Sequence, residues 1–172
     1  MRPIVAVAVL AGSVLVASAA FADDRVSGTL TRTFVIVEDT ELVGDVTCEV
    51  GAGTPCFSFG APNVELRLNG FRITGRGDAV TACGGAATPG EAGITTANMS
   101  GVVVRGPGLV QRFRGDGITV TGSRNTRIED VTLSMNCMSG VRVLATSFDT
   151  IVQGNIAVGN GSSMAGLLCG GI

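Results

Sequence analysis

The sequence predicts an all-β chain wound as a parallel β-solenoid of about five short coils. Two observations carry this prediction: short runs in which apolar and polar residues alternate, and a repeat of about 24 residues. A third observation is compositional, because 26 glycines in 172 residues supply the frequent corners that such a chain needs. The length suits one domain and is too short to expect two.

The first 22 residues are predicted to be a secretory signal peptide and are set apart from the fold. Arg2 precedes an apolar stretch from Ile4 to Ala20, and Ala20-Phe21-Ala22 has the small-residue form of a cleavage site. The mature chain would then be residues 23–172, secreted to the periplasm or the cell exterior; a retained signal anchor is the alternative. No later apolar run in the sequence is long enough to span a bilayer.

An N-terminal cap is expected over about residues 23–55, followed by coils over about 56–172. Within the cap, residues 28–47 have the pattern of two short strands, which would cover an otherwise exposed solenoid edge. The stretch from Arg76 to Glu91 exceeds the repeat and is predicted to protrude as a loop.

Three sets of apolar residues recur about 24 positions apart, and each set is expected to stack inside the solenoid at about 4.8 Å per coil. The sets are Ile94, Ile118, Val141 and Leu167; Val104, Ile128 and Val152; and Leu109, Leu133 and Ala157. Three sets per unit imply three short faces per coil. Asn136 and Asn160 repeat at the same interval, and we expect their amides to stack and bond at a turn.

A further coil begins at Gly166, and the sequence stops at Ile172. We therefore expect either a fragment of a longer solenoid or a minimal one. End-to-end self-association is the alternative use of the open edge.

The composition excludes several classes of function. His, Trp and Tyr are absent, and all 12 basic residues are arginines. Imidazole catalysis, imidazole metal ligands, Schiff-base lysine and the lysine-dependent phosphate loop are therefore excluded. A formal net charge of −2 argues against a nucleic-acid partner, and no cofactor is expected.

Five cysteines lie in the predicted mature chain, where disulfides persist. An odd number leaves at least one unpaired within the chain. Cys48 with Cys56, or either of them with Cys83, is the expected N-terminal bridge, and Cys137 with Cys169 is a second candidate pair. A zinc site is disfavoured because the sequence has no His and no C-x-x-C motif.

Four segments together resemble the right-handed parallel β-helix repeat proteins of the pectin-lyase-like superfamily, in particular its secreted bacterial members. The segments are VELRLNGFRITG, VVVRGPGLVQRFRGDGITV, NTRIEDVTLSMN and GNIAVGN. The resemblance covers about residues 28–172 and implies a right-handed β-helix in an extracellular, often carbohydrate-linked setting. It leaves the activity open, because this fold includes polysaccharide lyases, glycoside hydrolases and non-catalytic members.

Hydrolases of this superfamily use paired carboxylates, and its lyases use a Ca²⁺ site with an arginine as base. The candidate catalytic residues that the resemblance and the repeat bring near one another are Arg112, Arg114, Asp116, Glu129 and Asp130. Ca²⁺ would be the cofactor if the protein is a lyase. The alternative interpretation of Glu129-Asp130 is a solvated turn.

The sequence thus favours a secreted, non-catalytic β-helix that serves as a surface, envelope or glycan-binding module, with polysaccharide as its partner. The alternative is a polysaccharide lyase or glycoside hydrolase, with the loop at residues 76–91 as a wall of the site. A third hypothesis is a periplasmic role in metal maturation, suggested by Cys and Met residues from Met135 to Met138.

Overall fold

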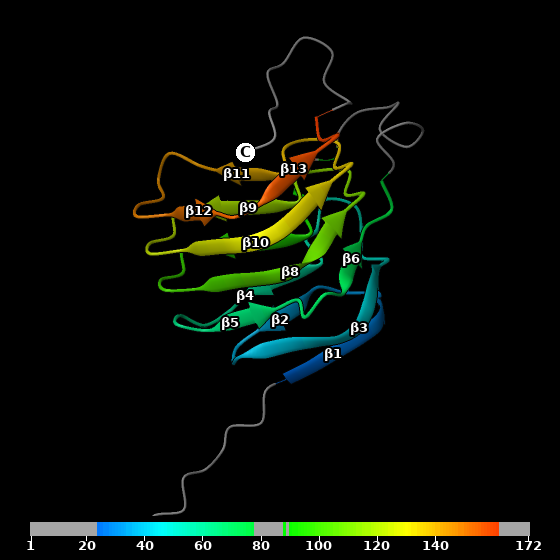
Figure 1. Ribbon diagram of the computed structural model, residues 1–172, viewed down its shortest axis with the longest axis horizontal. Helices are drawn as coiled ribbons and strands as arrows, with labels where there is room; N and C mark the ends of the chain where they lie inside the picture. The colour runs from blue at the N-terminus through cyan, green and yellow to red at the C-terminus, as the bar shows by residue number, and fades with distance from the viewer. Residues whose placement is uncertain (1–23, 78–87, 89, 162–172) are drawn as a thin grey trace, which may run out of the picture.

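In the computed structural model, which describes residues 24–77, 88 and 90–161, the protein is all-β and its strands pair in parallel (Figure 1). The described residues contain no helix. The strands are β1 (Asp24–Leu30), β2 (Phe34–Ile36), β3 (Thr40–Cys48), β4 (Phe57–Phe59), β5 (Glu65–Arg67), β6 (Arg72–Thr74), β7 (Ile94–Ala97), β8 (Val103–Gln111), β9 (Ile118–Thr121), β10 (Arg127–Ser134), β11 (Val141–Val143), β12 (Ile151–Gln153) and β13 (Ile156–Val158). The predicted all-β class is confirmed.

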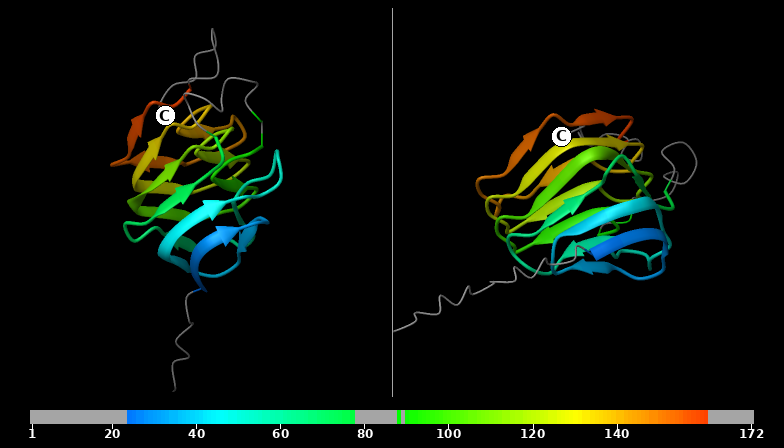
Figure 2. Two further views of the ribbon diagram at one scale, coloured as in Figure 1. Left: turned by 90° about the vertical axis from the view of Figure 1, so that its right-hand side faces the viewer. Right: turned by 60° about the horizontal axis from the view of Figure 1, so that its bottom comes forward.

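The strands form two sheets. Sheet A has the order β1-β3-β5-β8-β10-β12, with β6 between β3 and β8 and with β13 beside β10. Sheet B has the order β2-β4-β7-β9-β11. We call each passage of the chain through sheet A and then sheet B a layer, and successive layers lie side by side in every view (Figures 1 and 2).

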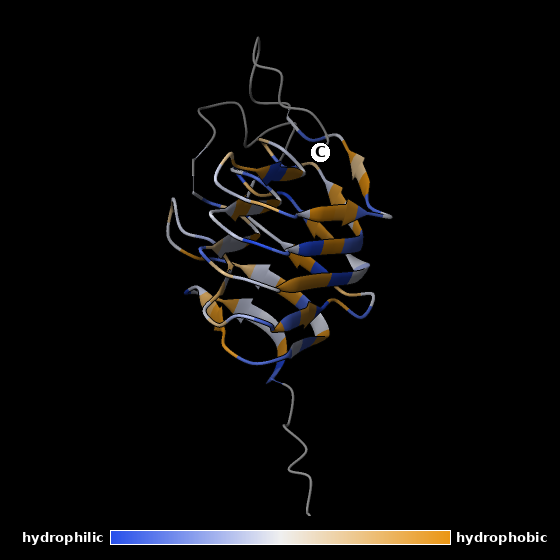
Figure 3. Cartoon of the chain, turned by 90° about the vertical axis from the view of Figure 1, so that its left-hand side faces the viewer, coloured by the Kyte–Doolittle hydropathy of each residue, from blue (hydrophilic) through white to orange (hydrophobic). Residues whose placement is uncertain are grey.

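The 24-residue repeat sets the register between layers. Ile94 pairs with Ile118, and Ile118 pairs with Val141, as predicted. Ile128 lies between Val104 and Val152 in the same way. Leu167 lies outside the described residues. The paired side chains on the inner faces are buried, whereas polar residues alternate with them along the strands (Figure 3).

The third predicted set is wrong at Leu109. Val110, which is fully buried, pairs with Leu133, whereas Leu109 pairs with Thr132 and is half-buried. The cause is a register shift between Glu129 and Val131, where β8 holds one residue more than β10. Leu133 pairs with Ala157 as predicted.

The sequence predicted three faces per coil, whereas the structure has two sheets. The first two faces are continuous in sheet A, because β3, β8 and β10 each run across both of them. In the third and sixth layers the same path is divided into two short strands, β5 with β6 and β12 with β13.

Asparagine and aspartate hold the corners where the backbone must turn with positive φ. One corner of four successive layers is formed in order by Asn63, Gly101, Asn125 and Asp149. The asparagines and Asp149 have φ between 52° and 57°, and Gly101 also has a positive φ. These residue types tolerate the left-handed region better than β-branched or bulky ones do.

The predicted stack of Asn136 on Asn160 is confirmed. Nδ2 of Asn136 donates to Oδ1 of Asn160 at 2.9 Å, and Nδ2 of Asn160 donates to the carbonyl of Leu133 at 2.9 Å. Oδ1 of Asn136 accepts from the backbone N–H of Phe113 at 3.1 Å. The two asparagines therefore bond successive layers together at a buried turn.

The N-terminal segment at residues 28–47 takes part in three strands, not the two predicted. The end of β1, all of β2 and most of β3 lie in it, and they belong to the same two sheets as the later layers. The predicted signal peptide lies outside the described residues.

A disulfide joins Cys48 to Cys56, as one of the predicted pairings has it. Cys137 is also disulfide-bonded, and Cys83 and Cys169 lie outside the described residues. Disulfides are typical of proteins in oxidising compartments. In the part of the chain that the structure describes, no helix has the length and apolarity needed to cross a bilayer.

Candidate functional site

The five candidate residues from the sequence lie in three different surroundings. Glu129 lies on the outer face of sheet A in β10, and Asp130 follows it at a bend with φ of 57°. Arg112 stands just after β8 with φ of 58°. Arg114 and Asp116 lie in the connection between β8 and β9, at the corner between the two sheets.

Glu129 belongs to an outer-face charge cluster, which consists of Glu65, Arg105, Arg127 and Glu129. Oε2 of Glu129 accepts from Nη1 of Arg105 at 2.8 Å, and Oε1 accepts from Nε of Arg127 at 2.7 Å. Arg105 also donates its Nε to Oε1 of Glu65 at 2.7 Å. The hydrogen bond to Glu65 is the main cause that raises the pKa of Arg105.

The carboxylate of Glu129 is 5% exposed, and its two oxygens accept bonds from both arginines. Gln153 adds a third donor at 3.2 Å. Both carboxylate oxygens are therefore engaged by guanidinium groups, which leaves little of the group open to a substrate.

Asp116 is 2% exposed and is held by groups from three elements. Oδ1 accepts from the backbone N–H of Ser139 at 3.0 Å, and Oδ2 accepts from the hydroxyl of Thr119 at 3.2 Å. Nε of Arg142 lies 2.9 Å from Oδ2. Burial raises the pKa of Asp116 above its ordinary value, and the charge of Arg142 opposes that rise.

Arg114 pairs with Glu91 at the same corner. Nε of Arg114 donates to Oε1 of Glu91 at 2.8 Å, and its Nη2 donates to Oε2, so the pair is bidentate. This hydrogen bonding raises the pKa of Arg114. Glu91, the end of the predicted loop at residues 76–91, is therefore buried in an ion pair; residues 78–87 and 89 of that loop are outside the described part.

The carboxylates proposed for catalysis thus differ in burial and in pairing. Asp116 and Glu129 are buried and paired, whereas Asp130 is exposed. Within the described residues, no three His, Cys, Asp or Glu side chains gather where they could hold a metal ion. Cys137 is buried and disulfide-bonded, so it offers no free thiol to the metal-maturation hypothesis.

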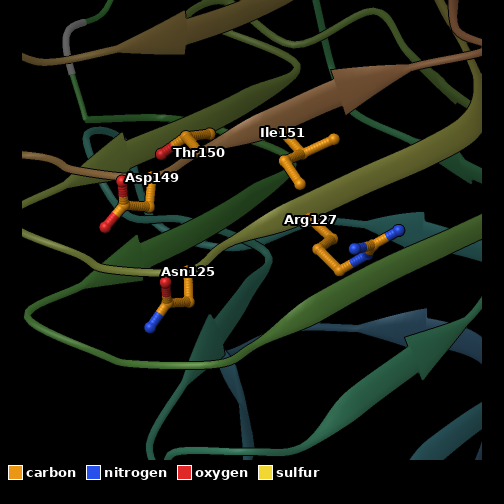
Figure 4. Close-up of a pocket in the computed structure, with 5 residues that line it drawn as sticks. All are labelled: Asn125, Arg127, Asp149, Thr150 and Ile151. Atoms are coloured by element: carbon orange, nitrogen blue, oxygen red, sulfur yellow. The ribbon is translucent and has the colours of Figure 1, made fainter.

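An open pocket with both polar and apolar lining lies beside the outer-face charge cluster (Figure 4). Its volume is about 340 Å³, which falls within the range of small-molecule sites. The pocket is lined by Asn125, Arg127, Asp149, Thr150 and Ile151. In Figure 4, Asn125 and Asp149 stand on one side of the pocket, and Arg127 and Ile151 stand on the other.

Thr150, one of the lining residues, has an unpaired hydroxyl that is enclosed by protein atoms. Its Oγ1 is buried and has no hydrogen-bond partner among the described residues, and the same holds for Oγ1 of Thr126. Thr126 and Val102 occupy the equivalent position in the two preceding layers, because Ile151, Arg127 and Val103 are paired in register.

An aromatic ring flanks the pocket. Phe148, next to Asp149 in the chain, is 52% exposed. The guanidinium carbon of Arg124 lies 5.0 Å from the centre of this ring, which is a cation–π distance.

Sequence reasoning missed the pocket residues and Arg105, although the repeat contained a signal for them. Arg105 and Glu129 carry opposite charges one period apart, and Asn125 and Asp149 are also one period apart. Residues one period apart on an outward face lie side by side, so charge complementarity across the period indicates an ion pair.

The described residues therefore contain buried ion pairs on the outer face of sheet A and at the corner between β8 and β9, and an open pocket of mixed lining beside the first of these. Comparison of the chain with family models, with curated proteins and with solved structures found no match.

Proposed function

We propose that this protein is a secreted, right-handed parallel β-helix of the pectin-lyase-like type, and that it acts as a non-catalytic glycan-binding module. Parallel pairing of each layer with the next supports the fold proposal, as does the stacking of inner residues one period apart. The signal-peptide pattern in the sequence and the Cys48–Cys56 disulfide support secretion.

One observation carries the choice of a binding module over an enzyme. The buried carboxylates among the candidate catalytic residues, Asp116 and Glu129, are enclosed and paired with arginines, so neither faces a substrate, while the accessible pocket is lined by amide, guanidinium, carboxylate and aliphatic groups. A glycosidase needs one carboxylic acid that can give a proton and a second carboxylate facing the same bond. A binding module needs only polar groups directed at sugar hydroxyls beside an apolar contact.

The proposal is tested by measuring binding and turnover on one panel of polysaccharides. Affinity electrophoresis in gels that contain neutral or acidic polysaccharides, with and without Ca²⁺, reports binding. Assays for new reducing ends and for unsaturated products report hydrolase and lyase turnover. We expect retardation by at least one polysaccharide and no turnover on any of them.

Three outcomes would count against the proposal. Absence of retardation across the panel would show that the protein does not bind these glycans. Turnover that is lost when Asp116 and Asp130 are both changed to Ala, in a variant whose circular dichroism spectrum is unchanged, would establish the enzyme alternative at the site first inferred from the sequence. Turnover that survives this double change would place the chemistry elsewhere in the molecule.

A further inference from the structure

We infer that the pocket formed by Asn125, Arg127, Asp149, Thr150 and Ile151 binds an uncharged sugar unit, and that Glu129 positions Arg127 for this role. The inference rests on the proposed glycan binding and adds to it the place, the class of sugar and a positioning residue.

The lining of the pocket matches the chemistry of a sugar ring. Arg127 is a donor, Asp149 is an acceptor, and the amide of Asn125 is both. Adjacent hydroxyls on a sugar both donate and accept, so they can satisfy this mixed set. Ile151, which is 41% exposed, gives the aliphatic contact that a ring's C–H face needs.

Asn125 gives the sharpest test of the pocket, because it is exposed, lines the pocket and has a backbone φ of 52°. Glycine adopts this conformation readily, as Gly101 does at the equivalent corner, so Asn125→Gly removes the amide without straining the turn. Asn63 is exposed, has a φ of 57° and does not line the pocket, which makes Asn63→Gly a natural control. The hydroxyl of Thr150 is enclosed by protein atoms and plays no part in this test.

Charge balance favours an uncharged sugar over a uronate. The positive charge of Arg127 is matched by the buried carboxylate of Glu129, to which it gives Nε and Nη2. Asp149 adds an exposed negative charge on the opposite side of the pocket. A sugar carboxylate would therefore compete with Glu129 for Arg127 and would be repelled by Asp149.

Arg127 is held in place through a chain of ion pairs that crosses three layers. Glu65 in β5 holds Arg105 in β8, Arg105 holds Glu129 in β10, and Glu129 holds Arg127. A long side chain fixed in advance loses less conformational freedom when it binds a ligand. Glu129 thus acts on the ligand through Arg127, without touching it.

The first experiment uses isothermal titration calorimetry of the purified protein with neutral hexasaccharides (of glucose, xylose and mannose units) and with hexagalacturonate. We expect at least one neutral hexasaccharide to bind more tightly than hexagalacturonate. Asn125→Gly should weaken its binding about tenfold or more, whereas the matched control Asn63→Gly should leave it unchanged. Both variants replace an exposed asparagine of positive φ with glycine, so their small effects on the thermal unfolding temperature should be similar.

The second experiment tests the positioning role. Glu129→Gln removes the charge that Arg127 and Arg105 share, and it should weaken binding of the neutral sugar while strengthening binding of hexagalacturonate. If Glu129 only stabilised the fold, Glu129→Gln would weaken binding of the neutral sugar and of hexagalacturonate alike. Asp149→Asn, which suits the positive φ of that position, should also strengthen hexagalacturonate binding.

The results distinguish failure of the proposed glycan binding from failure of the proposed pocket. If no hexasaccharide and no polysaccharide binds, the proposed function fails. If neutral sugars bind but Asn125→Gly and Asp149→Asn have no effect, glycan binding stands and this pocket is the wrong site. If hexagalacturonate binds more tightly than every neutral hexasaccharide, the class of sugar is wrong.

Discussion

Buried carboxylates of this protein lie beside arginines, and the surroundings of each decide how its charge behaves. Glu129 has guanidinium donors on both oxygens. Asp116 has one arginine, one hydroxyl and one backbone N–H, and its burial outweighs them in raising its pKa. Because burial raises its pKa, Asp116 reduces the stability of the folded chain when it ionises.

Asp116 therefore predicts a specific dependence of stability on pH. Because its pKa in the folded chain is raised above 3.8, the folded chain holds a proton over a pH range in which the unfolded chain has lost it. The free energy of unfolding should fall as pH rises through that range. Asp116→Asn removes this contribution, so the stability of the natural protein minus that of the variant should be greatest below pH 3.8 and should decline as pH rises.

Urea unfolding from pH 3 to pH 8, followed by circular dichroism, measures this difference. Asp24→Asn, which removes one exposed carboxylate at the start of β1, is the matched control and should show a smaller trend. A difference that grows as pH rises would mean that Arg142 outweighs burial at Asp116.

At the scale of the strands, the register shift between β8 and β10 gives a second prediction. Val110→Ala opens a cavity at a fully buried position and should reduce the free energy of unfolding by about 2 kcal/mol. Leu109→Ala removes more atoms but from a half-buried position, and it should cost less than about 1 kcal/mol. Denaturant unfolding of both variants measures the two values, and the reverse order would restore the register predicted from the sequence.

Much of the fold could be predicted from the repeat, and Leu109 shows where that method stops. Ile94, Ile118 and Val141 were placed correctly because each directly follows a glycine, which aligns the three layers although the spacings are 24 and 23 residues. A constant period cannot reveal that β8 holds one extra residue beside the bend at Asp130, since the neighbouring Leu109 and Val110 are both apolar.

The candidate site was harder to predict, because ion pairs depend on which outward residues share a layer boundary. Glu129 was a catalytic candidate because of its acidic neighbour Asp130, yet its partners are Arg105, one period earlier, and Arg127, on the same strand. The pocket lies at a corner, where the loop conformations of two layers combine, and periodicity carries little information about corners.

At the scale of the whole molecule, each layer contacts the layers beside it and stability is built from these neighbouring contacts. The strands of sheet A pair only with those of adjacent layers in the described part, as in repeat proteins generally. Inner strands such as β8 are paired on both sides, whereas β1 is paired on one side, with β3.

Hydrogen exchange should therefore be graded along the stack. We expect paired amides of β8 and β10 to exchange more slowly than those of β1 by about 100-fold or more, because opening β1 breaks one layer boundary and opening β8 breaks two. Mass spectrometry of peptides from each layer measures the gradient. Equal protection in β1 and β8 would show that the stack opens as one unit.

Val102, Thr126 and Thr150 occupy one corner position in three successive layers, and this bears on how the corner could change over time. Valine is fully buried at this corner in one layer, so the scaffold itself accepts a side chain without a hydroxyl at that position. Selection could therefore add or remove the enclosed hydroxyl at position 150 with almost no effect on folding, while the layers on either side stay as they are.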